Sequence, residues 1–208
     1  MITEIVPVTK QKYRIVTDEQ LAFVLYKGEL SHYHLAVFQE IQPEIWEEIQ
    51  TVLIKRATQR AMYLLTKKDY TMEQLYKKLS EGEYTQEAVN QAIAYVKSYH
   101  YIDDERYVQN YIRYQSGKKS RRQIQFELEK KGIPKDMIDK FQDDIDELKT
   151  SEIELIRELL QKRCKEPEKA DEKEKSKHYM YFMRKGFQSS DIMDVFREFF
   201  VTTQPCEI

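Results

Sequence analysis

Residues 128–138 read LEKKGIPKDMI, with a large apolar residue at each end and a third, Ile133, midway between them. The same spacing occurs earlier as LSEGEYTQEAV at residues 79–89 and later as FMRKGFQSSDI at residues 182–192, each with a glycine close before the central residue. The copies recur roughly every 50 residues, near the period at which self-similarity indicates a repeat architecture. The sequence therefore predicts one small helical unit repeated three times.

Helix start and stop signals surround each copy. Gly132 and Gly186 occupy positions where a helix commonly ends through a left-handed turn. Before three of the predicted helices a Ser or Thr has Gln or Glu three positions later, the pattern of a capping box: Thr71 with Gln74, Ser120 with Gln123, and Ser151 with Glu154. Together with apolar spacing, these signals predict helices at residues 43–67, 72–80, 86–99, 104–115, 121–131, 134–148 and 152–164, and a final helix reaching about residue 200.

Residues 2–26 differ from the rest of the chain. Three short runs rich in β-branched and aromatic residues predict a two- or three-stranded antiparallel sheet, which we expect either to pack on the helices or to be mobile. The predicted fold is thus mainly α, with a small N-terminal β segment. Its predicted parts are a β-rich extension at 1–41 and repeats at 43–101, 102–148 and 151–201, the last with a charged insertion at 165–173.

Composition excludes several classes of protein. The chain has 208 residues, a net charge of −2 and five glycines, and it contains no phosphate-binding glycine motif. No apolar run is long enough for a membrane span and no secretory signal is present, so we expect a cytoplasmic protein that binds no membrane. Cys164 and Cys206 have neither a Cys-x-x-Cys pattern nor neighbouring histidines, so we expect free thiols and no metal site.

Asp103, Asp104 and Glu105 form a tight acidic cluster at the start of a predicted helix. Three carboxylates can hold a divalent cation for hydrolysis, but these positions equally suit an N-cap followed by two acids that oppose the helix dipole. A metal nuclease needs further carboxylates at fixed positions, and the sequence does not supply them. We therefore predict a structural role, no catalytic residue, no cofactor and no enzymatic activity.

The middle repeat carries the densest basic run of the chain. Its candidate partner- or DNA-binding residues are Arg113, Lys118, Lys119, Arg121, Arg122, Lys130 and Lys131. The alternative interpretation is that this run is a solvated basic loop that binds no partner. Tyr107, Tyr111 and Tyr114 have the spacing of a core stripe, although tyrosines can also stack on bases. Acidic residues dominate 136–147, and such mixed charge suits a protein partner better than tracking of a phosphate backbone.

The segment YIDDERY at residues 101–107, the helix RRQIQFELEKKGI at 121–133 and RKGF at 184–187 resemble the RecX family of bacterial regulatory proteins. The resemblance covers roughly residues 55–201. The N-terminal strands resemble the extension of the longer members from Gram-positive bacteria. Two positions depart from the family pattern: the turn at 81–84 is one residue longer, and Gln123 replaces a usual basic residue.

The resemblance implies three tandem three-helix repeats in an elongated, curved body. It further implies a monomeric modulator of the RecA recombinase in DNA repair, homologous recombination and the SOS response. Family members lie in the groove of the RecA filament on single-stranded DNA and inhibit its ATPase and strand exchange. We expect the basic middle repeat to contact RecA or DNA, with weak binding to single- or double-stranded DNA alone. The alternative is a nucleic-acid-binding helical repeat module that acts without RecA.

Overall fold

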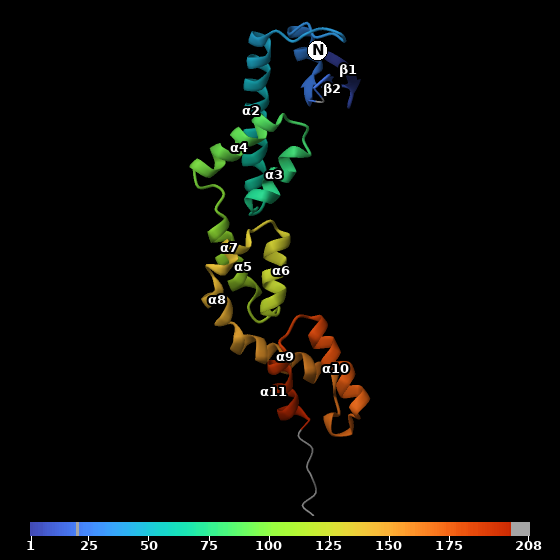
Figure 1. Ribbon diagram of the computed structural model, residues 1–208, viewed down its shortest axis with the longest axis vertical. Coiled ribbons are helices and arrows are strands. Elements are labelled where there is room, and N and C mark those ends of the chain that lie inside the picture. Colours follow the sequence, from blue (N-terminus) through green and yellow to red (C-terminus); the bar gives the residue numbers. More distant parts are fainter. Residues whose placement is uncertain (20, 201–208) are drawn as a thin grey trace, which may run out of the picture. The chain divides into compact units, whose positions relative to one another are not determined.

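The structure is a computed structural model that describes residues 1–19 and 21–200 (Figure 1). The chain divides into two compact units, Met1–Asp104 (unit 1) and Glu105–Ile208 (unit 2). The described residues are mainly helical, and three antiparallel strands precede the helices, as the sequence predicts. Among the helices of this part of the chain, none combines the length and apolar character needed to cross a bilayer.

The N-terminal sheet has the order β1-β2-β3, with bounds Ile2–Pro7, Lys12–Thr17 and Ala22–Tyr26. Ile15 lies opposite Ile5 on one side and Phe23 on the other, so strand alternation directs one face of the sheet to the core. Ile15 and Phe23 are fully buried. A helix, α1 (Lys27–His32), follows the third strand directly.

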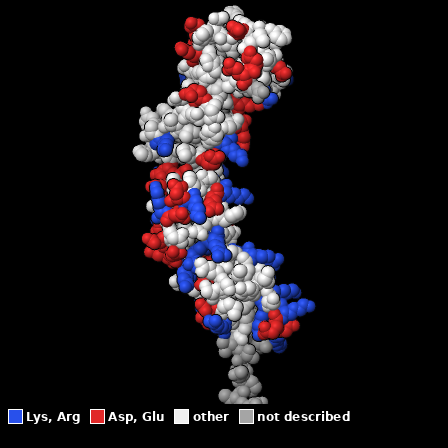
Figure 2. Space-filling view, viewed as in Figure 1, with Lys and Arg blue, Asp and Glu red and all other residues white. Residues whose placement is uncertain are grey.

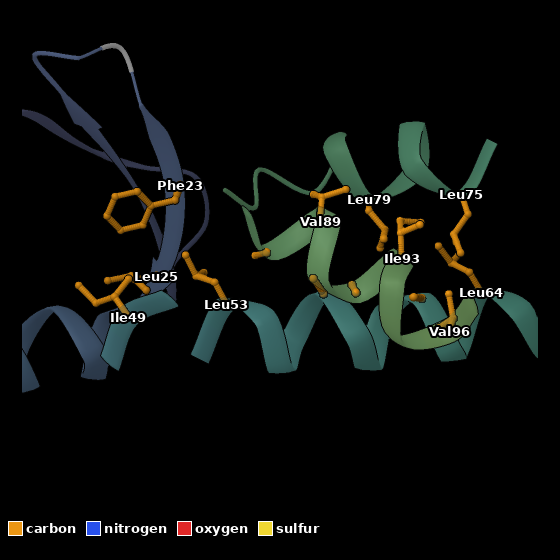
Figure 3. Packing of buried hydrophobic residues seen from close by; sticks show 14 of the residues in the cluster. Phe23, Leu25, Ile49, Leu53, Leu64, Leu75, Leu79, Val89, Ile93 and Val96 are labelled. Carbon is orange, nitrogen blue, oxygen red and sulfur yellow. The ribbon is translucent and has the colours of Figure 1, made fainter. Parts of the chain in front are cut away.

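The sheet and the first helical repeat share one hydrophobic core (Figure 3). The helices of this repeat are α2 (Pro43–Leu65), α3 (Met72–Ser80) and α4 (Gln86–Ser98). Figure 3 shows Phe23 and Leu25 of the sheet beside Ile49 and Leu53 of α2. Phe23 also meets Trp46 edge to face, with ring centroids 5.4 Å apart. The extension therefore packs on the helices, which is one of the two outcomes predicted for so small a sheet.

Unit 2 contains the remaining helices and two further hydrophobic clusters among its described residues. The first cluster lies among α5 (Asp104–Gln115), α6 (Arg121–Lys130), α7 (Lys135–Asp139) and α8 (Gln142–Asp146). The second lies among α9 (Lys149–Arg163), α10 (Glu172–Arg184) and α11 (Ser189–Phe199). A short 3-10 turn, Pro167–Lys169, lies within the charged insertion, and residue 201 of the predicted third repeat, like Cys206, lies outside the described residues.

Two helix predictions in unit 2 are wrong. The helix predicted at 134–148 is two short helices, α7 and α8, separated by a turn at Lys140 and Phe141. Aspartates spaced three or four apart in this segment repel one another and have low helix propensity, which accounts for the break. The helix predicted from residue 152 begins at Lys149, and Ser151 is not its cap. Glu147 and Leu148 already have helical dihedral angles, so the chain needs no extended capping residue there.

The predicted caps at Thr71 and Ser120 and the predicted stops at Gly132 and Gly186 are confirmed. Thr71 and Gln74 form a reciprocal capping box, and the Ser120 hydroxyl accepts a hydrogen bond from the Gln123 N–H at 3.2 Å. Gly132 and Gly186 end their helices with φ of +85° and +82°. In the first repeat the longer turn moves the left-handed position from the glycine to Glu83, with φ of +56°.

Replacing Gly186 tests how tightly its turn packs. An added Cβ at Gly186 would lie 3.0 Å from the Ser120 Oγ, whereas one at Gly117, also left-handed, would meet nothing within 4 Å. We expect Gly117→Ala to lower the free energy of unfolding by about 1–2 kcal/mol, the cost of the left-handed conformation alone. Gly186→Ala should cost more in urea denaturation. Equal costs for the two variants would show that the close approach to Ser120 contributes nothing.

Candidate functional site

Helix α6 has two faces of different character. Arg121, Ile124 and Leu128 are buried and have the i, i+3, i+7 spacing of a core stripe. Arg122, Phe126 and Lys130 follow the i, i+4, i+8 spacing and are exposed, and we call them the outer stripe. The Phe126 side chain is 63% exposed although it is large and apolar. One helix thus holds the fold together on one face and presents an aromatic ring between two cations on the other.

The exposed basic residues of the predicted patch lie on and before this helix. Among the described residues, none forms an ion pair with Arg113, Lys118, Arg122 or Lys130. Lys118 places its Nζ 3.6 Å from the centre of the Tyr114 ring, which is itself 67% exposed. These four cations are therefore not neutralised by carboxylates of the described chain.

Lys119 and Lys131 are instead partly buried against a cluster between α5 and α6. The Lys119 Nζ lies 2.5 Å from the Glu127 Oε2, and the Tyr111 hydroxyl donates to the same carboxylate. Burial raises the pKa of Glu127, but the hydrogen bonds from Lys119 and Tyr111 outweigh it and leave the pKa lowered. Burial and the Glu127 carboxylate both raise the pKa of Tyr111, so its hydroxyl stays protonated as the donor.

The tyrosines of α5 differ in burial: two pack in the core, and one is exposed where it could stack on a partner. Tyr107 and Tyr111 are partly buried against the core and stack on each other, with ring centroids 6.1 Å apart and planes inclined by 11°. The Lys131 Nζ lies 5.2 Å from the Tyr111 ring centre. This geometry agrees with the core-stripe interpretation for these two rings. Tyr114 is exposed, so of the three it alone presents its ring to a partner.

Arg121 does not lie on the basic surface where the sequence placed it. Its guanidinium is only 9% exposed and is held between two carboxylates that are almost fully buried. Its Nη2 lies 2.8 Å from the Asp191 Oδ2, and its Nε donates to the Glu152 Oε2. Because α9 carries Glu152 and α11 carries Asp191, this Arg121 cluster ties α6 to two of the helices of the last repeat.

The Ser120 hydroxyl, next to Arg121, adds a further contact between α6 and the last repeat. The Ser120 Oγ donates a hydrogen bond of 2.7 Å to the Lys185 carbonyl at the end of α10. Burial is the main cause of the raised pKa of Glu152; the contacts with Arg121 lower this pKa, and the negative charge of Asp191 adds slightly to the rise. The core-stripe spacing of Arg121 with Ile124 and Leu128 is the sequence signal that distinguishes it from its exposed neighbour Arg122.

The surface of the second repeat also carries exposed carboxylates. They are exposed on and around α7 and α8: Asp136, Asp139, Asp143, Asp144, Asp146 and Glu147. The face seen in Figure 2 carries Lys and Arg side chains interspersed with Asp and Glu side chains over this part of the chain. The surface therefore offers both signs of charge, as the sequence predicts.

The acidic cluster at 103–105 has structural partners. The Asp104 Oδ1 accepts a hydrogen bond of 2.8 Å from the Met72 N–H at the first turn of α3. Glu105 pairs with Lys140 at 3.1 Å. Burial is the main cause of the raised pKa of Asp104, and the Met72 N–H opposes it. The Asp104 side chain thus caps a helix of the first repeat.

A second group of cations, which the sequence did not predict, lies around a cavity in unit 1. A cavity of about 430 Å³ is lined by cations and tyrosines that include Lys12, Arg56, Arg60, Tyr26 and Tyr63. The Arg56 guanidinium lies 4.4 Å from the centre of the Tyr26 ring, while Arg56 also pairs with Glu29. These cations come from β2 and α2, which are far apart in the sequence, so no linear run of charge marks the site.

Removing Arg121 tests whether the Arg121 cluster is structural. Arg121→Ala leaves buried Glu152 without its cation and leaves Asp191 with only Lys149, whose Nζ is 4.0 Å from its carboxylate, so we expect a loss of about 3–5 kcal/mol in the free energy of unfolding. The neighbouring variant Arg122→Ala removes an exposed charge and should change stability by no more than about 0.5 kcal/mol. Urea denaturation followed by circular dichroism measures both. A small loss for Arg121→Ala would contradict the structural role.

Asp104 should leave a pH signature. A carboxyl whose folded pKa is raised stabilises the protein below its unfolded pKa and loses that contribution as pH rises through the folded pKa. We therefore expect Asp104→Asn, which keeps an acceptor for the Met72 N–H, to gain stability relative to the unmodified protein as pH rises above the ordinary pKa of an aspartate. Asp103→Asn serves as the neighbouring comparison. A difference that stays constant with pH would contradict the raised pKa.

Comparison with known proteins identifies the helical repeats. The models of the first, second and third three-helix domains of RecX match residues 57–95, 103–140 and 150–196. The chain is 29% identical over 195 residues to the regulatory protein RecX of Caldanaerobacter subterraneus subsp. tengcongensis, covering 92% of this chain and 96% of that protein. It is 34% identical over 141 residues to RecX of Actinobacillus pleuropneumoniae serotype 5b, covering 64% and 88%.

A solved structure gives the same fold. The crystal structure of a regulatory protein RecX superposes with a TM-score of 0.61 and 23% identity, over 93% of this chain and 98% of that one. The three domain matches account for the three predicted repeats, and RecX proteins are regulatory proteins rather than enzymes. The chain therefore belongs to the RecX family of regulatory proteins.

Proposed function

We propose that this protein binds the RecA filament on single-stranded DNA in the cytoplasm and inhibits its ATPase and strand exchange. It would thereby act in DNA repair, homologous recombination and the SOS response. Membership of the RecX family supports the regulatory role. The main observation behind the site is the outer stripe, where exposed Phe126 lies between Arg122 and Lys130, two cations that have no ion-pair partner among the described residues.

The chemistry of the outer stripe fits such a filament. Arg122 and Lys130 attract either phosphate oxygens of DNA or carboxylates of a protein, and the guanidinium can bind both oxygens of one group at once. Phe126 offers apolar area that gains free energy when a partner covers it. An exposed aromatic residue flanked by cations is therefore a better candidate for a contact point than the basic loop alone.

The distribution of charge favours a protein-containing partner over bare DNA. DNA presents a uniform negative surface, which the exposed carboxylates around α7 and α8 would repel. A filament of protein and DNA presents both signs and can complement both halves of the second repeat. We expect the protein to be a monomer that binds single- or double-stranded DNA alone only weakly.

The second candidate is a nucleic-acid-binding repeat module that acts without RecA. Exposed Tyr114 beside Lys118, together with Phe126, supports it, because aromatic rings beside cations are the usual means of holding single strands. The same residues serve both candidates, so the decisive quantity is affinity for DNA in the absence of RecA.

Two single changes in the outer stripe test the proposed function. We expect Arg122→Glu and Phe126→Ala each to raise the concentration needed for half-inhibition of RecA ATPase on single-stranded DNA by about tenfold, the size of one lost charge or stacking contact. Lys55→Glu, an exposed charge reversal on α2, and Met180→Ala, an exposed apolar truncation on α10, should leave inhibition unchanged.

Direct titration of labelled single-stranded DNA across salt concentrations separates the two candidates. Weak binding that falls steeply with salt, combined with inhibition of the RecA ATPase, agrees with the filament proposal. Tight binding at physiological salt without an effect on RecA would favour the independent module. Full inhibition by both outer-stripe variants would refute the assignment of this site while leaving the partner itself open.

A further inference from the structure

Cys164, Glu174 and His178 meet in the third repeat although they are not close in sequence. Cys164 is the residue that ends α9, and Glu174 and His178 lie one turn apart on α10. One potential ligand atom from each, the Cys164 sulfur, a Glu174 carboxylate oxygen and a His178 ring nitrogen, lies within 4.8 Å of the other two. No other group of this kind occurs among the side chains that the structure describes.

His178 provides an independent observation at the same place. Its side chain is only 6% exposed, and neither ring nitrogen has a hydrogen-bond partner among the described residues. The Glu174 Oε1 is 3.8 Å from the His178 Nε2, too far for a good hydrogen bond. A buried imidazole without partners loses free energy relative to one in water, so its position calls for a ligand.

From this geometry we propose that Cys164, Glu174 and His178 form a binding site for a transition-metal ion, with Zn²⁺ as its preferred occupant. Thiolate and imidazole ligands favour Zn²⁺ over Mg²⁺ or Ca²⁺, which bind oxygen. Three protein ligands and a water complete a tetrahedron, and the thiolate and carboxylate together neutralise the ion's charge. The site is independent of the proposed contact with RecA.

The ligands need only a small movement to close on the ion. In a tetrahedral zinc site such ligand atoms lie roughly 3.4–3.7 Å apart, so the triad must contract by about 1 Å. Glu174 is half exposed and can swing inward, while Cys164 and His178 are already fixed by burial. Solvent reaches His178 and Glu174 through a cavity of about 660 Å³, which gives an ion its route.

The local charge sets a limit on affinity. The same cavity is lined by Arg163, Lys173, Lys177 and Arg184 against the carboxylates of Asp171 and Glu174. These cations oppose a divalent ion, so we expect moderate rather than very tight binding. Bound metal would tie the end of α9 to the first turns of α10 and so close the charged insertion at 165–173. The sequence did not predict this site because Cys164 has no metal-binding partner near it along the chain.

Cobalt titration of the reduced, metal-free full-length protein tests the proposal. Co²⁺ bound to a thiolate gives a charge-transfer band in the near ultraviolet and visible bands that report tetrahedral geometry. We expect one equivalent to bind, the charge-transfer band to disappear in Cys164→Ser, and the band to persist in the matched thiol control Cys206→Ser. Competition by Zn²⁺ against a chromophoric chelator then gives the affinity for zinc.

Two further variants keep the test informative if Cys164→Ser folds poorly. Glu174→Gln changes an exposed side chain and should weaken Zn²⁺ binding at least tenfold without altering the circular dichroism spectrum, and His178→Gln should weaken it similarly. Saturating Zn²⁺ should raise the thermal midpoint of the unmodified protein but not that of Glu174→Gln. Absence of a thiolate band, or equal affinity in Glu174→Gln, would overturn the site.

Discussion

The buried ion cluster of Arg121 with Glu152 and Asp191 is the interaction on which unit 2 depends most. Its three charged side chains are almost completely removed from water, and they come from three different helices. Breaking such a cluster is far costlier than losing a surface pair, because the remaining charges stay buried without compensation. The Ser120 hydrogen bond to the Lys185 carbonyl and the close approach of Gly186 to Ser120 lie at the same junction.

This constraint also positions the proposed partner-binding surface. Arg121 fixes the rotation of α6 about its own axis. The residues of the outer stripe must therefore face outward. Arg122 and Phe126 are exposed for that reason, although Phe126 would gain from burial. The contacts of Glu127 with Lys119 and Tyr111 hold α5 against another side of α6. Unit 1 is instead held together by a single hydrophobic core that the sheet shares with α2 to α4.

Local patterns predicted much of the fold and little of the site. The capping box at Thr71 and the left-handed glycines at 132 and 186 depend on residues within one turn, and they form as predicted. The prediction of one helix at 134–148 was wrong because the helical spacing of apolar residues continues through the segment, while its aspartates repel one another and interrupt the helix. The sequence showed the basic run, but it was not used to predict that Arg121 is buried while the adjacent Arg122 is exposed.

The repeat, its helix ends and the β-rich extension could be predicted from the sequence because they depend on interactions between residues close in the chain, and the family could be predicted from its motifs. Which charges are buried in the protein and which are exposed became clear only from the packing of the helices. The carboxylates that hold Arg121, the Met72 N–H that Asp104 caps and the meeting of Cys164 with His178 all involve separate helices. Burial and pairing between distant segments depend on how helices pack, and no local periodicity encodes that packing.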